Sequence, residues 1–183
     1  MTNLNIQKII EIPESVQVTV EGKEVIVKGE KGELRKILPD YDIKVSQSGN
    51  EVTLGYKENT KKRKRTLHTS AAHIKNMAQG VTEGFEYKLK ICSGHFPMNV
   101  SLKGDVLEVK NFIGESVPRK LKIKQGVEVK VNGDIIEVKG NDKELSGIVA
   151  GDIEKLTKRP GFDKRIFQDG IYIIEKPAKR LSE

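Results

Sequence analysis

The chain of 183 residues has a single cysteine, no tryptophan and few aromatic side chains, at 5 % of the total. The lone Cys92 excludes an internal disulfide and is typical of a protein from a reducing compartment. No run of about 18 apolar residues is present, which excludes a membrane-spanning helix. The N-terminus lacks a basic stretch followed by a long apolar run, so we expect no signal peptide and a cytoplasmic protein.

Motifs that carry chemistry are equally scarce. His68 and His73 are five residues apart, which places them on different helical faces and makes a poor metal pair. Cys92 and His95 supply half of a zinc-binding pattern without a second half, and no acid is evident in the sequence to orient the histidine for catalysis. The glycine-rich segment 27–34 lacks the spacing of a phosphate-binding loop. We therefore expect no metal, no cofactor, no small-molecule substrate and no enzymatic activity.

What the chain does contain is an internal repeat. Residues 18–28 match residues 100–110 at an offset of 82, and residues 43–54 match their counterparts at an offset of 84, in the same order. A repeat of roughly 80 residues is too long for a solenoid unit. The sequence therefore predicts two tandem domains, residues 1–82 and residues 83–183. The matching positions are Val18 with Val100, Val20 with Leu102, Gly22 with Gly104, Val27 with Val109, Val45 with Val129, Gly49 with Gly133 and Val52 with Ile136.

Alternation of apolar and polar residues in the first copy predicts a hairpin over 16–20 and 24–28, a strand over 34–38 and a second hairpin over 42–46 and 51–55. The period then changes to that of an amphipathic helix from about Thr60 to Gln79. Gly80 is the expected helix stop. The apolar stripe comprises Leu67, Ala71, Ile74 and Ala78.

The second copy follows the same plan, with a strand over 85–91 and hairpins around Gly104 and 132–134. Its helix ends before Pro160, and a last strand follows over 171–174. The fold class is therefore α+β, with two homologous domains, each a mostly antiparallel sheet packed against one helix. The stripe of the second helix comprises Leu145, Val149, Ile153 and Leu156.

Positive charge is concentrated in two stretches of a chain whose net charge is +7. Residues 61–65 are five consecutive bases, and residues 155–180 hold eight bases against three acids. Such concentration favours a polyanionic partner over a generally soluble surface.

The run 61–65 lies at the expected start of the first helix, where each cation opposes the helix dipole by about 0.3–1 kcal/mol. A bound phosphate would reverse this effect. The alternative is a solvated, partly frayed helix end. The second copy has the mildly acidic residues 141–144 instead, which indicates functional divergence.

Residues 158–172 have no counterpart in the first copy and mix bases with Pro, Gly, Phe and Tyr. Fixed loops with interleaved cations are suited to RNA. The alternative is that Phe162, Phe167 and Tyr172 are core residues, and for Phe167 and Tyr172 we favour that interpretation.

Four strings of the sequence carry a resemblance. Two are Val27-Lys28-Gly29 with Gly32-Glu33-Leu34, and Asn76-Met77 with Gly80-Val81-Thr82 and Gly84-Phe85. The other two are His95-Phe96-Pro97-Met98-Asn99-Val100, and Phe167 with Asp169-Gly170-Ile171-Tyr172. Together they resemble one family over essentially the whole chain, the sixth large-subunit ribosomal protein, and the last two resemble its archaeal and eukaryotic members in particular. The chain departs from bacterial members at Phe162-Asp163-Lys164-Arg165, where those have a Tyr-Lys-Gly-Lys-Gly type loop.

The resemblance implies a structural protein of the large ribosomal subunit, near the base of the factor-binding stalk and its proteins. It implies contact with the sixth domain of the large-subunit rRNA beside the sarcin–ricin loop, mainly through the second repeat. Three alternatives stay open: a free-standing RNA-binding or assembly factor, an enzyme using a groove between the domains, and a module for an acidic protein partner. The expected rRNA-binding residues are Lys61, Lys62, Arg63, Lys64, Arg65, His68, Lys158, Arg159, Phe162, Lys164, Arg165, Lys176, Lys179 and Arg180.

Overall fold

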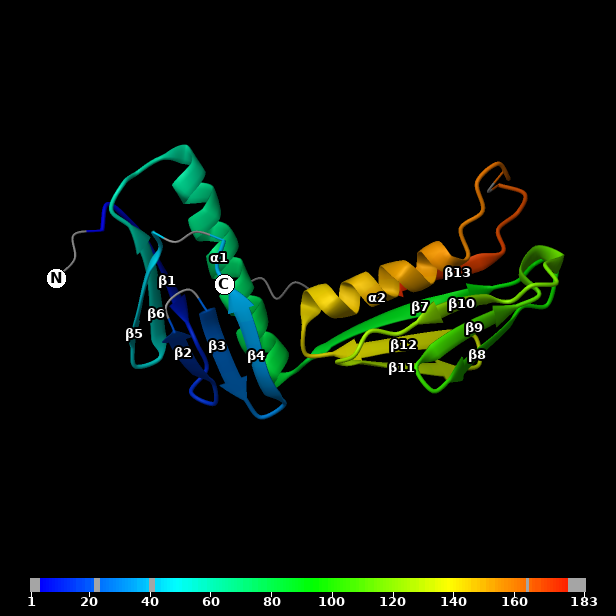
Figure 1. The fold of residues 1–183 in the computed structure, drawn as a ribbon, viewed down its shortest axis with the longest axis horizontal. Helices are drawn as coiled ribbons and strands as arrows, with labels where there is room; N and C mark the ends of the chain where they lie inside the picture. Colours follow the sequence, from blue (N-terminus) through cyan, green and yellow to red (C-terminus); the bar gives the residue numbers. More distant parts are fainter. Residues whose placement is uncertain (1–3, 22–23, 40–41, 164, 178–183) are drawn as a thin grey trace. The chain divides into compact units, whose positions relative to one another are not determined.

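The computed structural model describes residues 4–21, 24–39, 42–163 and 165–177 (Figure 1). The chain divides into two compact units, Met1–Gly84 and Phe85–Glu183. The division expected from the sequence, between residues 82 and 83, falls at the end of helix α1 (Lys61–Thr82). Neither helix of the described part is long and apolar enough to cross a membrane.

The first unit contains two three-stranded antiparallel sheets and helix α1. One sheet has the order β1-β6-β5 and the other β2-β3-β4. Strand β1 lies before the first strand that the alternation predicts. The strands are β1 (Ile6–Glu11), β2 (Gln17–Glu21), β3 (Glu24–Gly29), β4 (Gly32–Ile37), β5 (Lys44–Ser48) and β6 (Glu51–Tyr56).

Helix α1 holds the first unit together because it contacts strands of both sheets. All four residues of the predicted stripe are buried, and Ile74 is fully buried. They pack in one cluster with Val25 and Val27 of β3 and Leu54 of β6. The predicted helix face is therefore confirmed.

The predicted helix stop at Gly80 is wrong. Gly80 is a buried residue inside α1, which continues to Thr82, and the left-handed turn falls at Gly84, with φ of 79°. The reason is packing: Val81 is fully buried against Gly29, where an added Cβ would lie 2.6 Å from the Val81 Cγ2. Tertiary contact thus extends the helix past a residue that, by propensity, would end it.

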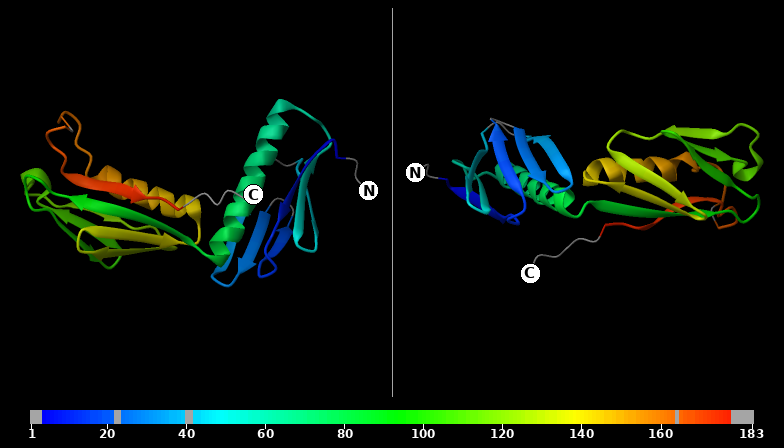
Figure 2. Two further views of the ribbon diagram at one scale, coloured as in Figure 1. Left: turned by 180° about the vertical axis from the view of Figure 1, so that it is seen from behind. Right: turned by 90° about the horizontal axis from the view of Figure 1, so that it is seen from below.

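The second unit repeats this plan with one four-stranded sheet, β11-β12-β7-β13, and one three-stranded sheet, β10-β9-β8. Helix α2 (Lys143–Leu156) contacts strands of both (Figure 2). A 3₁₀ turn, η1 (Phe112–Gly114), precedes β10. The strands are β7 (Phe85–Cys92), β8 (Asn99–Lys103), β9 (Val106–Lys110), β10 (Arg119–Lys122), β11 (Val127–Asn132), β12 (Ile135–Gly140) and β13 (Gly170–Glu175).

The sequence repeat is reproduced in the strand register. Val18 faces Val27 across β2 and β3, and the matching residues Val100 and Val109 face each other across β8 and β9. Likewise Val45 faces Leu54, and Val129 faces Val138. The α+β class with two tandem domains is confirmed, and in each domain the strands are shared between two sheets that one helix covers.

Strand β13 has no equivalent among the described strands of the first unit. It pairs antiparallel with β7, beginning with Gly170 opposite Cys92. Residues 157–169 form the connection from the end of α2 to this added strand. The second repeat therefore carries an insertion that the first repeat lacks, as the sequence comparison predicts.

Candidate nucleic-acid interface

The start of α1 carries uncompensated positive charge. The helix begins after Thr60, whose Oγ1 accepts a hydrogen bond from the Arg63 N–H at 3.3 Å, and its first turn holds no acid. Among the described residues, no acidic side chain forms an ion pair with four exposed cations of this turn and the next, so their charges add to the positive end of the helix dipole. These four, which we call the α1 cations, are Lys61, Lys62, Lys64 and Arg65.

Arg63 differs from its neighbours. Its guanidinium lies 2.8 Å from the Glu58 Oε2 and 3.0 Å from the Asp42 Oδ2, and 5.6 Å from the ring centre of Tyr56. Only 22 % of its side chain is exposed. The structure thus neutralises Arg63 within the unit, whereas His68, one turn further along, is exposed.

The start of α2 has the opposite chemistry. The Asp142 Oδ1 accepts from the Glu144 N–H at 2.8 Å and the Leu145 N–H at 3.3 Å. Glu144 adds a second negative charge to the first turn. Both acids favour the helix, because they face the positive end of its dipole.

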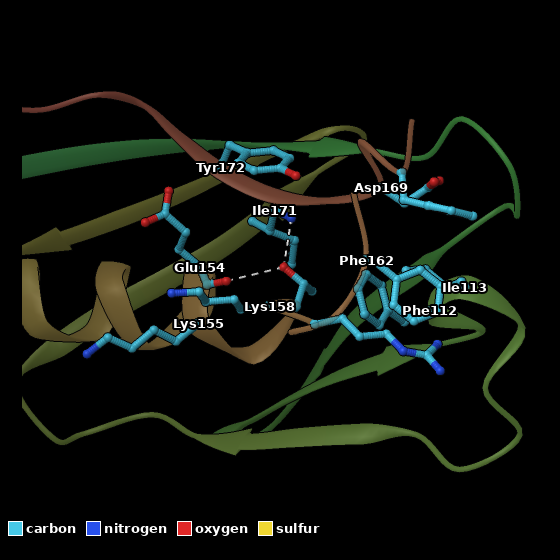
Figure 3. A pocket seen from close by; sticks show the side chains of 12 residues that line it. Phe112, Ile113, Glu154, Lys155, Lys158, Phe162, Asp169, Ile171 and Tyr172 are labelled. Carbon is cyan, nitrogen blue, oxygen red and sulfur yellow. Dashed lines mark hydrogen bonds between the residues drawn. The ribbon is translucent and has the colours of Figure 1, made fainter. Parts of the chain in front are cut away.

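The other end of α2 opens into a pocket of about 320 Å³ (Figure 3). Its walls come from the helix end, the inserted loop, β13 and η1. Three of the predicted site residues, Lys158, Arg159 and Phe162, meet here. Lys155, Phe112, Ile113 and Tyr172 are among the other lining residues.

An ion-pair network fixes the loop to the helix end. The Arg119 guanidinium holds Glu115 at 2.7 and 2.8 Å, and its Nη1 donates to the Leu156 carbonyl at 2.7 Å. The Arg159 Nη1 lies 3.7 Å from the same Glu115. The hydrogen bond from Arg119 is the main reason that the pKa of Glu115 is lowered. Sequence reasoning missed Arg119 and Glu115, because a pair four residues apart is common on surfaces, and the contacts that bring it to the pocket, with Leu156 and Arg159, are distant in the sequence.

A second anchor is the buried Asp169. Its Oδ1 accepts from the backbone N–H groups of Gly94 (2.6 Å) and His95 (3.0 Å), and its Oδ2 lies 2.7 Å from the His95 Nδ1. Burial alone would raise the pKa of Asp169, but the hydrogen bonds from His95 and Gly94 outweigh it and lower the pKa. The sequence did not identify this acid beside His95, because Asp169 is 74 residues distant in sequence and adjacent in space.

The aromatic residues of the insertion are only partly core residues. Phe167 is half-buried, with its ring 4.9 Å from that of Phe162 and 5.2 Å from that of His95. Tyr172 is 38 % exposed, so its assignment to the core is wrong. Side chains alternate along β13, and the fully buried Ile171 takes the inward position.

The remaining predicted cations have different surroundings. Arg165 is 90 % exposed, yet its Nη2 lies 2.8 Å from the Asp163 Oδ2, and this contact is the main cause of the lowered pKa of Asp163. Lys176 is exposed just after β13. Three predicted residues lie outside the described part of the chain, namely Lys164, Lys179 and Arg180.

The class of protein follows from these features: a duplicated α+β protein with a cationic surface on each repeat. Within residues 4–21, 24–39, 42–163 and 165–177, no group of three or more His, Cys, Asp or Glu side chains is arranged to hold a metal ion.

Comparison with known proteins gives the family. The family model for ribosomal protein L6 matches residues 12–84 and 96–170, one match in each repeat. The large ribosomal subunit protein uL6 of Methanococcus vannielii is 45 % identical over 96 % of this chain and 97 % of its own length. Its counterpart from Methanothrix thermoacetophila is 41 % identical over 91 % and 95 %. The chain belongs to the ribosomal protein L6 family, in its archaeal form, and as a member of a family of structural proteins it is not an enzyme.

Proposed function

We propose that this protein is a structural constituent of the large ribosomal subunit and that it binds large-subunit rRNA through both repeats. The observation that carries the proposal is the similarity along almost the whole chain to proteins named as large-subunit components. The exposed cations of both repeats supply the chemistry, because cations that neutralise phosphates release counterions from RNA.

In the first repeat, the proposed contact is made by the α1 cations and His68. A phosphate placed at the start of α1 would lie near the α1 cations and near the first N–H groups of the helix, before Arg63, whose own N–H is donated to Thr60. Arg63 holds Asp42 and Glu58, so we assign it a positioning role for this turn rather than a phosphate contact.

In the second repeat, the proposed contact surrounds the end of α2. Lys158 and Arg165 would bind phosphates, and Arg159 and Phe162 would face the RNA beside them. Lys164, Lys176, Lys179 and Arg180 extend the same basic segment and remain part of the proposal. The RNA partner is the sixth domain of the large-subunit rRNA near the sarcin–ricin loop, with stalk-base proteins as neighbours and the cytoplasm as the compartment.

The deciding experiment is sedimentation of a cell lysate through a sucrose gradient, with and without ribonuclease, with detection of this chain. We expect it to sediment with the large subunit and to leave that position after RNA digestion. Sedimentation as a small free protein in both gradients would contradict the proposal. Co-sedimentation only with an immature precursor particle would favour an assembly factor instead.

A further inference from the structure

The pocket at the end of α2 has a composition that phosphate binding alone does not require. Phe162 and Tyr172 keep 36 % and 38 % of their surfaces exposed beside it. Phe112 is almost fully buried beneath. Two exposed lysines, Lys155 and Lys158, lie on its rim. Aromatic walls with a cationic rim are suited to a flat, uncharged ring that is attached to a charged backbone.

The backbone on the η1 side of the pocket is strained. Ile113 lines the pocket with φ of 48° and ψ of 41°, a left-handed conformation that a β-branched residue rarely adopts. Asn111, two residues earlier, also has a positive φ, of 57°. Such strain persists only where the surrounding structure fixes it, and it is concentrated at binding sites. This observation is independent of the charge pattern and indicates the same pocket.

A stack already exists at the pocket wall. The Arg159 guanidinium lies 4.2 Å from the ring centre of Phe162 and is held there by Glu115. The Phe162 ring also makes a T-shaped contact with the Phe167 ring, at an interplanar angle of 80°. Unstacked RNA bases pack on aromatic rings and on guanidinium planes, so a preformed stack lowers the entropic cost of receiving one.

The acids near the pocket do not oppose an RNA base. The Asp169 carboxylate is occupied by Gly94 and His95. The Glu154 Oε1 accepts from the Ile173 N–H at 3.1 Å. Two carboxylates so close to the pocket interior disfavour a phosphate there, whereas the lysines outside favour one.

We propose that this pocket receives a single unstacked nucleobase of the large-subunit rRNA, stacked against the Arg159–Phe162 pair, with Lys158 on a flanking phosphate. The inference rests on the proposed function and names the part of the RNA that the second repeat recognises. Tyr172 of β13 also lines the pocket (Figure 3).

The absence of tryptophan makes a direct test possible, because the Phe162→Trp variant has one reporter at the pocket. Its fluorescence would be measured with protein-free large-subunit rRNA, and the Ile148→Trp variant is the control. Ile148 is 47 % exposed on α2 and does not line the pocket. We expect RNA to quench the pocket reporter at least twofold more than the control. Equal quenching, or none, in a complex that forms normally would overturn the inference.

The affinity of a Phe162→Leu variant separates the two proposals. Loss of one stacked base predicts binding that is about 5- to 100-fold weaker. Ile148→Leu is the matched control, and circular dichroism checks the fold of both. If the unmodified chain fails to bind the rRNA, the proposed function fails. If it binds and Phe162→Leu binds equally well, only the base pocket fails.

Discussion

The two repeats share their cross-strand pairs and helix packing but differ at opposite ends of their helices. In the first repeat the cations lie at the start of α1, and in the second they lie beyond the end of α2. The start of α2 instead has Asp142 and Glu144. The matching segments supply the cross-strand core pairs, and the parts that differ carry the exposed cations that we propose for RNA binding.

The two placements have different consequences for stability. Cations near the end of α2, such as Lys155, face the negative end of the dipole and favour the helix. The α1 cations face the positive end and oppose it. Only in the first repeat does the surface that we propose for RNA conflict with the isolated fold, so removing those charges has opposite effects on stability and on binding.

The largest effect is expected from a variant that unfolds one repeat and leaves the other folded. Ile153 of α2 is fully buried, and Ile153→Asp would place an unpaired charge in the second core. Burial of such a charge costs several kcal/mol, about the stability of a small domain. We expect the second repeat to lose its amide protection from hydrogen exchange at neutral pH while the first repeat keeps its own.

Ile74→Asp is the matched variant in α1, where Ile74 is also fully buried. It should unfold the first repeat and spare the second. If either variant abolishes protection in both units together, the repeats are not independently stable.

The amphipathic periods were sufficient to predict both helices and their inward faces, because burial selects one stripe. Hairpins were predictable where a turn lies between alternating strands, as at Gly104 and Gly133, both of which have positive φ. These features depend on neighbours in the sequence. The internal repeat also predicts that the same strands pair in both domains, since two copies of one domain share one register.

The missed features depend on distant partners. Strand β10 has the sequence RKLK and resembles a charged loop, and its apolar Leu121 packs on the second core once β10 pairs with β9. Asp169 meets His95 because β13 adds to β7. The five consecutive cations are evident from the sequence, but only the structure distinguishes Arg63, which is paired with acids, from its exposed neighbours.

The next largest effect is expected from a variant without the α1 cations, which combines Lys61→Gln, Lys62→Gln, Lys64→Gln and Arg65→Gln. RNA affinity should fall, and the slope of log K against log salt should flatten by roughly 0.7–0.9 for each phosphate that the variant no longer neutralises. The first repeat should become more stable, since each charge near the helix start opposes it by about 0.3–1 kcal/mol. Salt-dependent binding and denaturant unfolding measure the two effects.

Arg63→Gln sharpens this contrast from within the same run. It breaks the pairs with Glu58 and Asp42. We expect lower stability with little change in the salt slope. A slope that flattens as much as for an α1 cation would show that Arg63 contacts RNA as well.

A smaller effect is expected at the Asp169 anchor of the second repeat. Asp169→Asn keeps an acceptor for the Gly94 and His95 N–H groups but removes the negative charge beside the His95 ring. Loss of a charge-assisted hydrogen bond predicts about 1–2 kcal/mol lower stability at neutral pH.

The contribution of the Asp169 charge to stability depends on pH, and the direction of this dependence tests the assignment. Because the pKa of Asp169 is lower in the folded chain, its contribution is present above the ordinary carboxyl range and is lost as the pH falls through the lowered pKa. The difference between Asp169→Asn and the unmodified chain should therefore shrink in acid. A difference that is constant from pH 7 to pH 2 would mean that the charge is not involved.

The smallest effect on RNA binding is expected from replacing single cations within the insertion. Lys158 is exposed on the pocket rim, whereas Arg165 is bound to the Asp163 carboxylate through its Nε and Nη2. RNA must compete with Asp163 for Arg165, so Lys158→Gln should weaken binding more than Arg165→Gln, and neither should shift the melting temperature measurably. Asp163→Asn should release Arg165 and strengthen binding slightly at low salt. If Arg165→Gln has the larger effect, the RNA displaces Asp163 on binding, and Arg165 rather than Lys158 is the main phosphate contact of the second repeat.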